Sequence, residues 1–280
     1  MDWNTTFVEW LERFSVVYGI LTLRYIIIAG LAFLIVWKIL SRRLEHKYIQ
    51  PDRRPTGKNI LHEIKYSFMT FFVFGLVGVF MFEATRNGWT RIYRDVGDFG
   101  WPYFFVSLLG TILLHDAYFY WTHRLMHWKK IFKHVHLVHH RSTNPTPWAA
   151  FSFHPLEAII EAGIVPLVAF LYPIHAGALL LFLFYMTSLN VLGHLGYELF
   201  PSGFTRNRST LWHNTSTHHN MHHKYFNCNY GLYFNWWDRF MKTNHPEYHE
   251  QFESKAAATS SNNAHAKDRK EISSPDIATL

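Results

Sequence analysis

Long apolar stretches constrain this chain more than any other feature of its sequence. Residues 21–40 form the first stretch, and residues 66–82 form a second that contains no charged side chain. A helix crosses a bilayer with about 20 consecutive apolar residues, because every backbone N–H and C=O group in lipid needs a partner within the helix. Arg24 and Lys38 lie toward the two ends of the first stretch, where long side chains can reach the interface. These stretches predict membrane-spanning helices.

Three further apolar blocks follow. Residues 101–114 run without a helix breaker into a polar segment that ends at His127. Residues 158–171 and 174–192 are joined at Tyr172-Pro173, and the proline favours a tight turn between two helices. We therefore expect an all-α, multi-pass bundle of about four to five apolar helices, of which the last two form a hairpin.

The distribution of Lys and Arg predicts how the bundle is oriented. The loop of residues 41–65 is richer in these residues than the loop of residues 83–100, and the richer loop is expected on the cytoplasmic side. Counting helices from there places every dense histidine cluster on the cytoplasmic face, as a histidine-rich helical cap. The net charge of +7 then suits an anionic membrane surface, and no nucleic-acid partner is expected.

The chain divides into three predicted regions. Residues 1–100 supply the first membrane helices and the basic loop, residues 101–250 form the histidine-rich catalytic domain, and residues 251–280 form a disordered polar tail. The N-terminus is acidic where a signal peptide is basic, so no signal peptide is expected. The single cysteine, Cys228, excludes an internal disulfide.

Histidine is enriched, with 20 in the chain, and three clusters stand out. His123 and His127 are four residues apart, so their rings project from one helix face about 40° apart. The other two clusters share the pattern His-x-x-His-His, in which the i, i+3 pair is expected on one face and the adjacent histidine about 100° away. The three clusters consist of His123 and His127, of His136, His139 and His140, and of His219, His222 and His223, with His218 directly in front.

Eight clustered imidazoles predict a metal site. A neutral imidazole binds Fe, Zn, Cu or Ni through its lone pair, and a catalytic zinc needs only three protein ligands. Eight histidines exceed the needs of one ion and suit two. His194 ends the last apolar block at the same membrane face and is a candidate ninth ligand.

Other polar residues nearby have less direct roles. His115 is expected deeper in the third helix, where it would hydrogen-bond a ligand. Asp116 beside it, His154 and His218 are each candidates for a ligand or for a partner of one. His175 lies in the hairpin turn on the opposite face and is excluded. Five further histidines are expected at the surface: His46, His62, His245, His249 and His265.

Several common motifs are absent from the sequence. No Glu-x-x-His pair of a carboxylate-bridged di-iron bundle occurs, and His62-Glu63 is followed by Tyr66 instead of the second histidine of a zinc protease. No glycine-rich dinucleotide loop and no haem-binding His-Pro-Gly-Gly occurs either. Any electrons for a redox reaction must come from another protein.

The motifs resemble those of the fatty acid hydroxylase/sterol desaturase superfamily. The resemblance runs from about Leu114 to Pro246, and one departure from several sterol members is Trp128 in place of a further histidine. After the last cluster, residues 226–239 are similar to the corresponding segment of lathosterol oxidases and cholesterol side-chain hydroxylases. The matching segments are Asp116-x-x-x-Tyr120-Trp-x-His123-Arg-x-x-His127, His136-x-x-His139-His140, Pro145-Thr-Pro-Trp-x-x-x-x-Phe153-His154-Pro155 and His218-His219-x-x-His222-His223.

The resemblance implies a membrane lipid oxidase. It would use two non-haem iron ions, O2 and two external electrons to desaturate or hydroxylate an unactivated C–H bond of a sterol-like or fatty acyl lipid. Zinc can occupy such imidazole sites by substitution. The electron donor would be a b-type cytochrome, a ferredoxin or a reductase. The eight clustered histidines match the family's ligands, and His194 matches a further family histidine.

An unactivated lipid carbon has no polar handle, so shape must orient it, and an apolar tunnel leading to the metals is expected. The predicted substrate contacts are Trp121, Tyr185, Leu189, Gly193, Tyr230 and Trp237. Two other classes remain open. A bis-histidine haem protein for electron transfer would place paired histidines within the membrane blocks, whereas these lie at their ends. The second class is a zinc-dependent membrane hydrolase or a metal transporter. A transporter would favour polar residues inside the spans.

Overall fold

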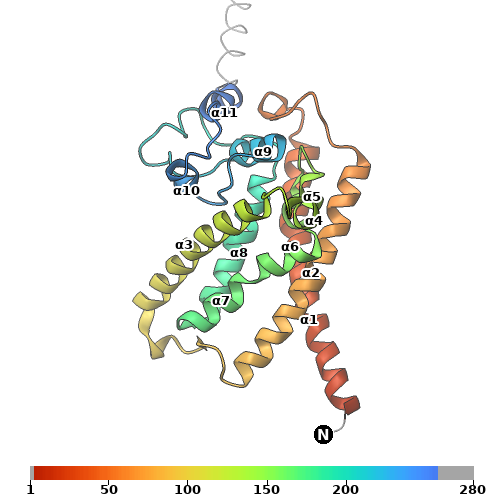
Figure 1. The fold of residues 1–280 in the computed structure, drawn as a ribbon, viewed down its shortest axis with the longest axis vertical. Coiled ribbons are helices and arrows are strands. Elements are labelled where there is room, and N and C mark those ends of the chain that lie inside the picture. Colours follow the sequence, from red (N-terminus) through yellow and green to blue (C-terminus); the bar gives the residue numbers. More distant parts are fainter. Residues whose placement is uncertain (1–2, 258–280) are drawn as a thin grey trace, which may run out of the picture.

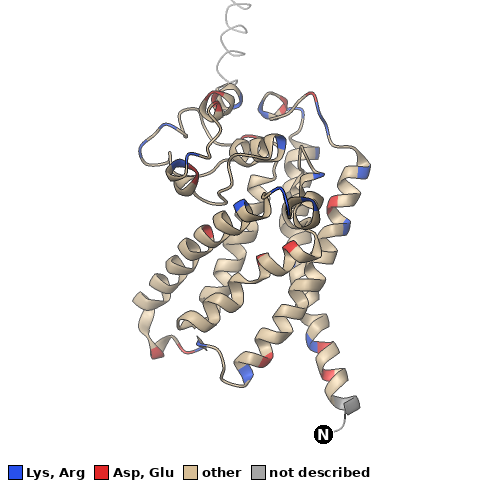
Figure 2. Ribbon diagram, viewed as in Figure 1, with Lys and Arg blue, Asp and Glu red and all other residues tan. Residues whose placement is uncertain are grey.

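The computed structural model describes residues 3–257 and confirms an all-α architecture with long apolar helices below a smaller cap (Figure 1). Four helices in this part are long and apolar enough to cross a membrane. They are α1 (Trp3–Ala32) with its continuation η1 (Phe33–Ile39), α2 (Gly57–Arg86), α3 (Gly100–Met126) and α8 (Ala176–Gly193). Lys, Arg, Asp and Glu gather toward the two ends of these helices (Figure 2).

The first helix begins much earlier than the apolar stretch at residue 21 predicted. The acidic N-terminal segment stays helical because Arg13 pairs with Glu9 one turn away, at 2.9 Å, and also with Glu83 of α2. The span therefore covers Thr6–Ile39, and η1 is a π-helix that ends it. Arg24 consequently lies well inside this long helix instead of near its end.

Helices α1 and α2 pack closely along their length. A Cβ atom on Gly75 would lie 2.8 Å from the Phe14 ring, and one on Gly78 would lie 2.6 Å from Val17. Small residues at such crossings allow membrane helices to approach without steric conflict. This contact fixes α1 beside α2 and gives the bundle one of its walls.

The predicted helix over residues 158–171 is wrong as a single element. The structure contains two short helices instead, α6 (Pro155–Ala162) and α7 (Ile164–Leu171). Pro166 explains the break, because a proline ring collides with the carbonyl group four residues earlier, which here belongs to Ala162. Neither helix is long enough to span a membrane, so the expected hairpin consists of one broken arm and one spanning helix, α8.

A small parallel sheet lies at the far end of the bundle from the cap. Strand β1 (Ile92–Tyr93) pairs with β2 (Ile174–His175). The short 3-10 helix η3 (Val96–Asp98) lies between β1 and α3 in the chain. The Tyr103 hydroxyl of α3 donates to the carbonyl of Pro173, the residue before β2, at 3.0 Å. This sheet fastens the starts of α3 and α8 to each other.

The cap consists of short elements and long loops. Helix α9 (Ser216–Tyr225) carries the last histidine cluster, and Glu198 fixes its N-terminus by accepting from the Thr217 amide at 2.9 Å. The other elements of the cap are η2 (Glu45–Lys47), α4 (Phe132–Val135), α5 (Leu137–His140), η4 (Pro147–Phe151), α10 (Trp236–Phe240) and α11 (Tyr248–Ala256).

The first residues of the predicted tail, from residue 251 on, belong to helix α11. Helix α11 continues to Ala256, and Phe252 is completely buried against Met221 of α9. The burial of Phe252 stabilises α11, although the polar composition of this segment does not predict a helix. Residues 258–280, including His265, lie outside the described residues.

Candidate metal centre

Nine histidines converge in two groups at the cap end of the bundle. In each group, one ring nitrogen of every histidine lies within 4.8 Å of those of the others. These are the eight clustered histidines together with His194, as the sequence predicted for a metal site; their role as ligands stays a prediction. The five-histidine group is His123, His127, His136, His140 and His222, and the four-histidine group is His139, His194, His219 and His223.

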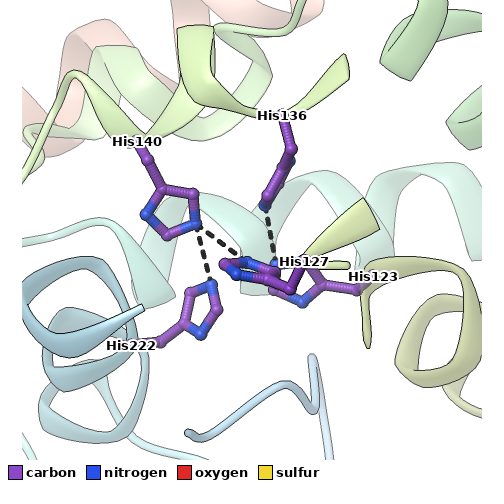
Figure 3. A group of neighbouring side chains, drawn as sticks. All are labelled: His123, His127, His136, His140 and His222. Atoms are coloured by element: carbon purple, nitrogen blue, oxygen red, sulfur yellow. Dashed lines mark hydrogen bonds between the residues drawn. The ribbon is translucent and has the colours of Figure 1, made fainter. Parts of the chain in front are cut away.

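Four segments of the chain supply these side chains. The end of α3 contributes His123 and His127, and the end of α8 contributes His194. The segment around α5 and helix α9 each contribute three histidines, divided between the groups. Figure 3 shows the five-histidine group, whose rings approach one another from α3, α5 and α9. Both groups therefore depend on how the cap sits on the bundle.

The division of the two His-x-x-His-His patterns corrects the sequence-based expectation. His136 and His140 belong to one group and His139 to the other, while His219 and His223 belong together and His222 does not. The i, i+4 pair thus shares a site, and the histidine at i+3 does not. Positions i and i+4 differ by about 40° on a helix, against about 60° for i and i+3, so the closer pair stays together.

The spacing between ring nitrogens fits metal coordination. In the five-histidine group, Nε2 of His140 lies 3.1 Å from Nε2 of His127 and 3.0 Å from that of His222. In the four-histidine group, Nε2 of His194 lies 3.0 Å from Nε2 of His219 and 3.4 Å from that of His139. Nitrogens about 2.1 Å from one ion would be separated by roughly 3.0 to 3.4 Å. Both groups therefore have the dimensions of an ion's first ligand sphere.

The opposite ring nitrogens are held by acceptors. Metal-binding histidines generally donate their other N–H to a carbonyl or carboxylate, which selects the tautomer whose lone pair faces the ion. Four of the nine show this arrangement through Nδ1, at 2.7 to 2.8 Å. The acceptors are the Tyr230 carbonyl for His123, the Cys228 carbonyl for His222, the Asn190 carbonyl for His194 and the Glu157 carboxylate for His136.

Burial keeps these imidazoles neutral. It lowers the pKa of every group member on α9 and around α5 well below its ordinary value, and repulsion from neighbouring imidazoles lowers it further. A neutral imidazole retains the lone pair that binds a metal. The two groups are therefore prepared to accept cations without first losing protons.

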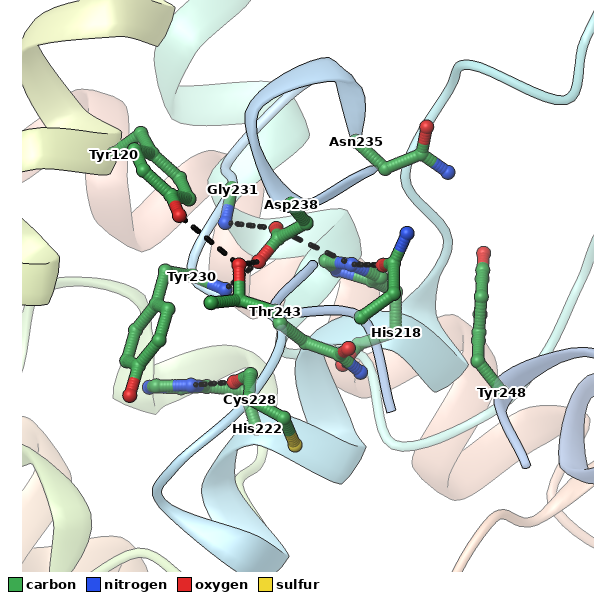
Figure 4. Close-up of polar contacts among 12 residues, drawn as sticks. Tyr120, His218, His222, Cys228, Tyr230, Gly231, Asn235, Asp238, Thr243 and Tyr248 are labelled. Atoms are coloured by element: carbon green, nitrogen blue, oxygen red, sulfur yellow. Dashed lines mark hydrogen bonds and ion pairs between the residues drawn. The ribbon is translucent and has the colours of Figure 1, made fainter. Parts of the chain in front are cut away.

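Asp238 holds the loop that supplies two of these acceptors (Figure 4). Its carboxylate accepts from the amides of Tyr230 at 2.9 Å and Gly231 at 2.7 Å, and from the Thr243 hydroxyl at 2.7 Å. His218 lies 3.6 Å away. The position of residue 231 requires glycine, because an added Cβ would come within 2.9 Å of Asp238 and 2.5 Å of the Phe234 carbonyl. The carboxylate thus fixes the direction of the neighbouring carbonyls that face His123 and His222.

The four candidates for supporting roles lie outside both histidine groups. His115 Nδ1 lies 2.8 Å from the Tyr233 hydroxyl, and Asp116 accepts from two backbone amides of the same segment, at residues 233 and 234. His154 accepts from the Leu156 amide and begins α6. His218 faces Asn244 and Asp238. Asp116 and His154 thus hold backbone amides near the groups, whereas His115 and His218 contact side chains.

The histidines expected at the surface also lie outside both groups, but the described ones are partly buried. His62 donates to the Val138 carbonyl at 3.2 Å and so links α2 to the second histidine cluster. His245 stacks on Tyr225, with ring centroids 4.5 Å apart. His46 and His249 each have a buried ring nitrogen. His175 begins α8 at the far end of the bundle, as the topology predicted.

An apolar cavity lies beside the two groups, between α1, α2, α3, α6, α7 and α8. It contains about 860 Å³ of space free of protein atoms, part of which opens to the outside. Phe119 and Phe153 line it, and their rings lie 4.9 Å from His123 and 5.2 Å from His139 respectively. One aromatic ring therefore separates the cavity from each histidine group.

The six predicted substrate contacts lie outside the lining of this cavity. Leu189 and Gly193 border a smaller recess beside His219, and Tyr185 packs on Tyr233. Trp121 and Trp237 pack on each other, and the Tyr230 ring lies beside His127. On α8, the residues that line the cavity are Leu183, Met186 and Asn190. They lie on a different face of the helix from the predicted contacts. Because α8 is apolar on almost every side, the sequence did not distinguish these faces.

Sequence reasoning missed Glu157 and Asp238 as supporting residues. Both are fully buried, and both stand beside quoted motifs. A buried carboxylate next to a histidine cluster is a usable signal, since charged groups are rarely buried without a partner. The backbone carbonyls of Cys228, Tyr230 and Asn190 have no side-chain signature at all.

Comparison with known proteins places this geometry in context. The profile described as "Fatty acid hydroxylase" matches residues 108–243. A Delta(7)-sterol 5(6)-desaturase of Gibberella zeae is 32% identical over 77% of this chain and 63% of its own length. Another from Aspergillus fumigatus is 30% identical over 77% of this chain and 70% of its own length.

A lathosterol oxidase of Rattus norvegicus is 33% identical over 58% of this chain and 53% of its own length. The matched segments thus span between about half and about 70% of these curated relatives. No solved structure matches the chain.

Proposed function

The chain belongs to the fatty acid hydroxylase/sterol desaturase superfamily, and from that premise we propose that it is a membrane lipid oxidase acting on an unactivated C–H bond of a sterol-like lipid. The observation that carries the proposal is the placement of two histidine groups one aromatic ring away from an apolar cavity among membrane helices. A strongly polar substrate does not match the mostly apolar lining of this cavity. A lipid does.

The two groups would each hold one metal ion. Two non-haem iron ions there would supply activation of O2, with two electrons from an external donor, because protein side chains alone cannot oxidise such a bond. Zinc is an alternative occupant by substitution. The donor set of neutral imidazoles, with Nδ1 protons held by carbonyls and a carboxylate, supports this assignment.

The chain's own residues would contribute geometry and a dry environment. Glu157 and the three carbonyl acceptors hold the imidazoles in the tautomer that turns Nε2 toward the centre. Phe119 and Phe153 limit the approach from the cavity to the histidine groups. A lipid in the cavity would be oriented by shape, and apolar walls would exclude water from the reacting carbon.

Sidedness follows from the basic loop. We place the histidine groups on the cytoplasmic face, because the loop of residues 41–65 contains more Lys and Arg than the loop of residues 83–100. An external redox protein, such as a b-type cytochrome, a ferredoxin or a reductase, would then approach the cap from that side.

Lipid profiling tests the proposal. Cells that express the chain are expected to gain a lipid with either one additional double bond or one additional hydroxyl group, which cells expressing His222→Ala lack. Identical lipid profiles with well-expressed, metal-loaded protein would refute it.

Metal analysis of the purified protein belongs to the same experiment. We expect about two ions per chain, one for each histidine group, and an optical spectrum without haem absorption. A Soret band would identify the haem alternative, and a hydrolytic product with zinc as the only active metal would identify a hydrolase.

Filling the cavity is expected to suppress turnover without loss of metal. Ala162 lines the cavity and is 6% exposed, so Ala162→Phe places a ring where the lipid would lie. We expect at least about a tenfold loss of turnover or a changed product pattern. Ile159→Phe on the same helix is the matched control, because Ile159 is 56% exposed.

Metal content and melting temperature show whether either variant remains folded. Ala162→Leu provides a milder filling if the phenylalanine is not accommodated. Unchanged turnover and products in both folded Ala162 variants would mean that the substrate binds elsewhere.

A further inference from the structure

Arg24 is an unexplained cation inside the membrane region. It lies roughly 16 Å along the helix from Arg13 and roughly 21 Å from Lys38, at about 1.5 Å per residue, so its side chain is far from either charged end. Its Nε is buried and has no hydrogen-bond partner. The side chain lines the apolar cavity. Ionisable residues inside a span are costly and usually serve a function.

Glu161 lines the same cavity from α6. Within the described part of the chain, no hydrogen bond or ion pair engages its carboxylate, and it does not pair with Arg24. A guanidinium group and a carboxyl group thus face one apolar cavity without pairing with each other. A protein gains no stability from two unpaired ionisable groups in such a place, so we infer that a ligand pairs with them.

We propose that Arg24 and Glu161 together bind a hydroxyl group of the lipid substrate. A hydroxyl both accepts and donates: the guanidinium N–H would donate to the hydroxyl oxygen, and the hydroxyl would donate its hydrogen to a carboxyl oxygen of Glu161. A ketone or an ester has no hydrogen to donate to Glu161 and satisfies only Arg24. The inference rests on the proposed function and names the group by which this site selects its substrate.

The location of Glu161 constrains the position of that hydroxyl relative to the reacting carbon. Glu161 is one helical turn after Glu157, so their side chains start about 6 Å apart. Glu157 in turn accepts from His136 at 2.7 Å. A hydroxyl held by Glu161 therefore lies on the order of 10 Å from the five-histidine group. This suits a rigid ring lipid whose alcohol is a few carbons from the reacting bond, in contrast to a long acyl chain with a remote headgroup.

Binding to metal-free protein tests this assignment separately from turnover. The probe is dehydroergosterol, a fluorescent sterol alcohol, compared with its acetate ester, in nanodiscs of neutral lipid. Energy transfer from tryptophan reports the affinity of each. We expect the alcohol to bind at least about tenfold more tightly than the ester, which is the effect of losing a hydrogen bond to a charged group.

Arg24→Met and Glu161→Gln are each expected to weaken binding of the alcohol by about tenfold and to leave binding of the ester within about twofold. Retained ester binding shows that the variant is folded. Arg91→Met is the matched control, because Arg91 is exposed and outside the cavity lining. Arg24→Lys should restore part of the preference for the alcohol.

Equal binding of alcohol and ester by the unmodified protein would overturn the assignment, and so would variants that keep the preference. Neither result bears on oxidation, which lipid profiling measures. Conversely, a preference for the alcohol that depends on both residues would stand even if no oxidised lipid were formed.

Discussion

His139→Ala and His222→Ala are each expected to reduce product formation by more than about a hundredfold. Loss of a residue that only supports a metal ligand typically costs 10- to 100-fold, and loss of a ligand should cost more. The two substitutions address different groups, since His139 belongs to the four-histidine group and His222 to the five-histidine group. Both groups are therefore expected to be essential.

Chelator titration distinguishes the two sites. At a chelator concentration that leaves the unmodified protein loaded, each variant should lose about one ion per chain and retain the other, because the altered group has lost one ligand and binds its ion more weakly, while the intact group keeps all of its imidazoles. His134→Ala is the control, as an exposed histidine in the same segment that lies in neither group. Normal product formation by either ligand variant would exclude that group from the reaction.

Asp238→Ala is expected to lower both metal affinity and product formation by about 10- to 100-fold, although Asp238 belongs to neither group. Its carboxylate holds the Tyr230 and Gly231 amides. Without it, the carbonyls that orient His123 and His222 lose their fixed direction. The effect should be concentrated in the five-histidine group, and chelator competition measures it.

Asp95→Ala is the matched control for this change. Asp95 also accepts from a backbone amide, that of Gly97 at 2.8 Å, but it lies near the far end of the bundle. We expect normal metal affinity and activity for this variant. If Asp238→Ala lost activity while its metal affinity stayed normal, the carboxylate would act in some way other than holding these carbonyls.

The nine histidines of the two groups could be selected from the sequence because the requirement for several nitrogen ligands leaves a dense, visible pattern. Their division between two groups could not. It depends on a difference of about 20° between i, i+3 and i, i+4 positions and on the break between α4 and α5 near His136. Such small angles are decided by tertiary packing.

The fold, like the site, could be predicted from the sequence only in part. Helix α3 was predictable because its apolar block continues into the first histidine cluster without a breaker. The split between α6 and α7 could have been anticipated from Pro166, four residues after Ala162. The cavity-facing side of α8 could not, because a helix that is apolar nearly all round carries no directional information. Arg24 was misplaced because the paired charges of Arg13 hid the true start of α1.

The small parallel sheet at the far end of the bundle is a fixed point, or pin, near which both α3 and α8 begin. Helix α3, of 27 residues, is a lever arm of about 40 Å that starts at this pin and ends at His123 and His127. A swing of one degree about the pin would displace the histidine end by roughly 0.7 Å, whereas metal sites tolerate only about 0.2 Å in ligand distance. Helix α8 starts at the same pin and ends at His194 of the other group. Two strands of two residues each, at the far end of the bundle from the nine histidines, are therefore expected to help set the separation of the two histidine groups.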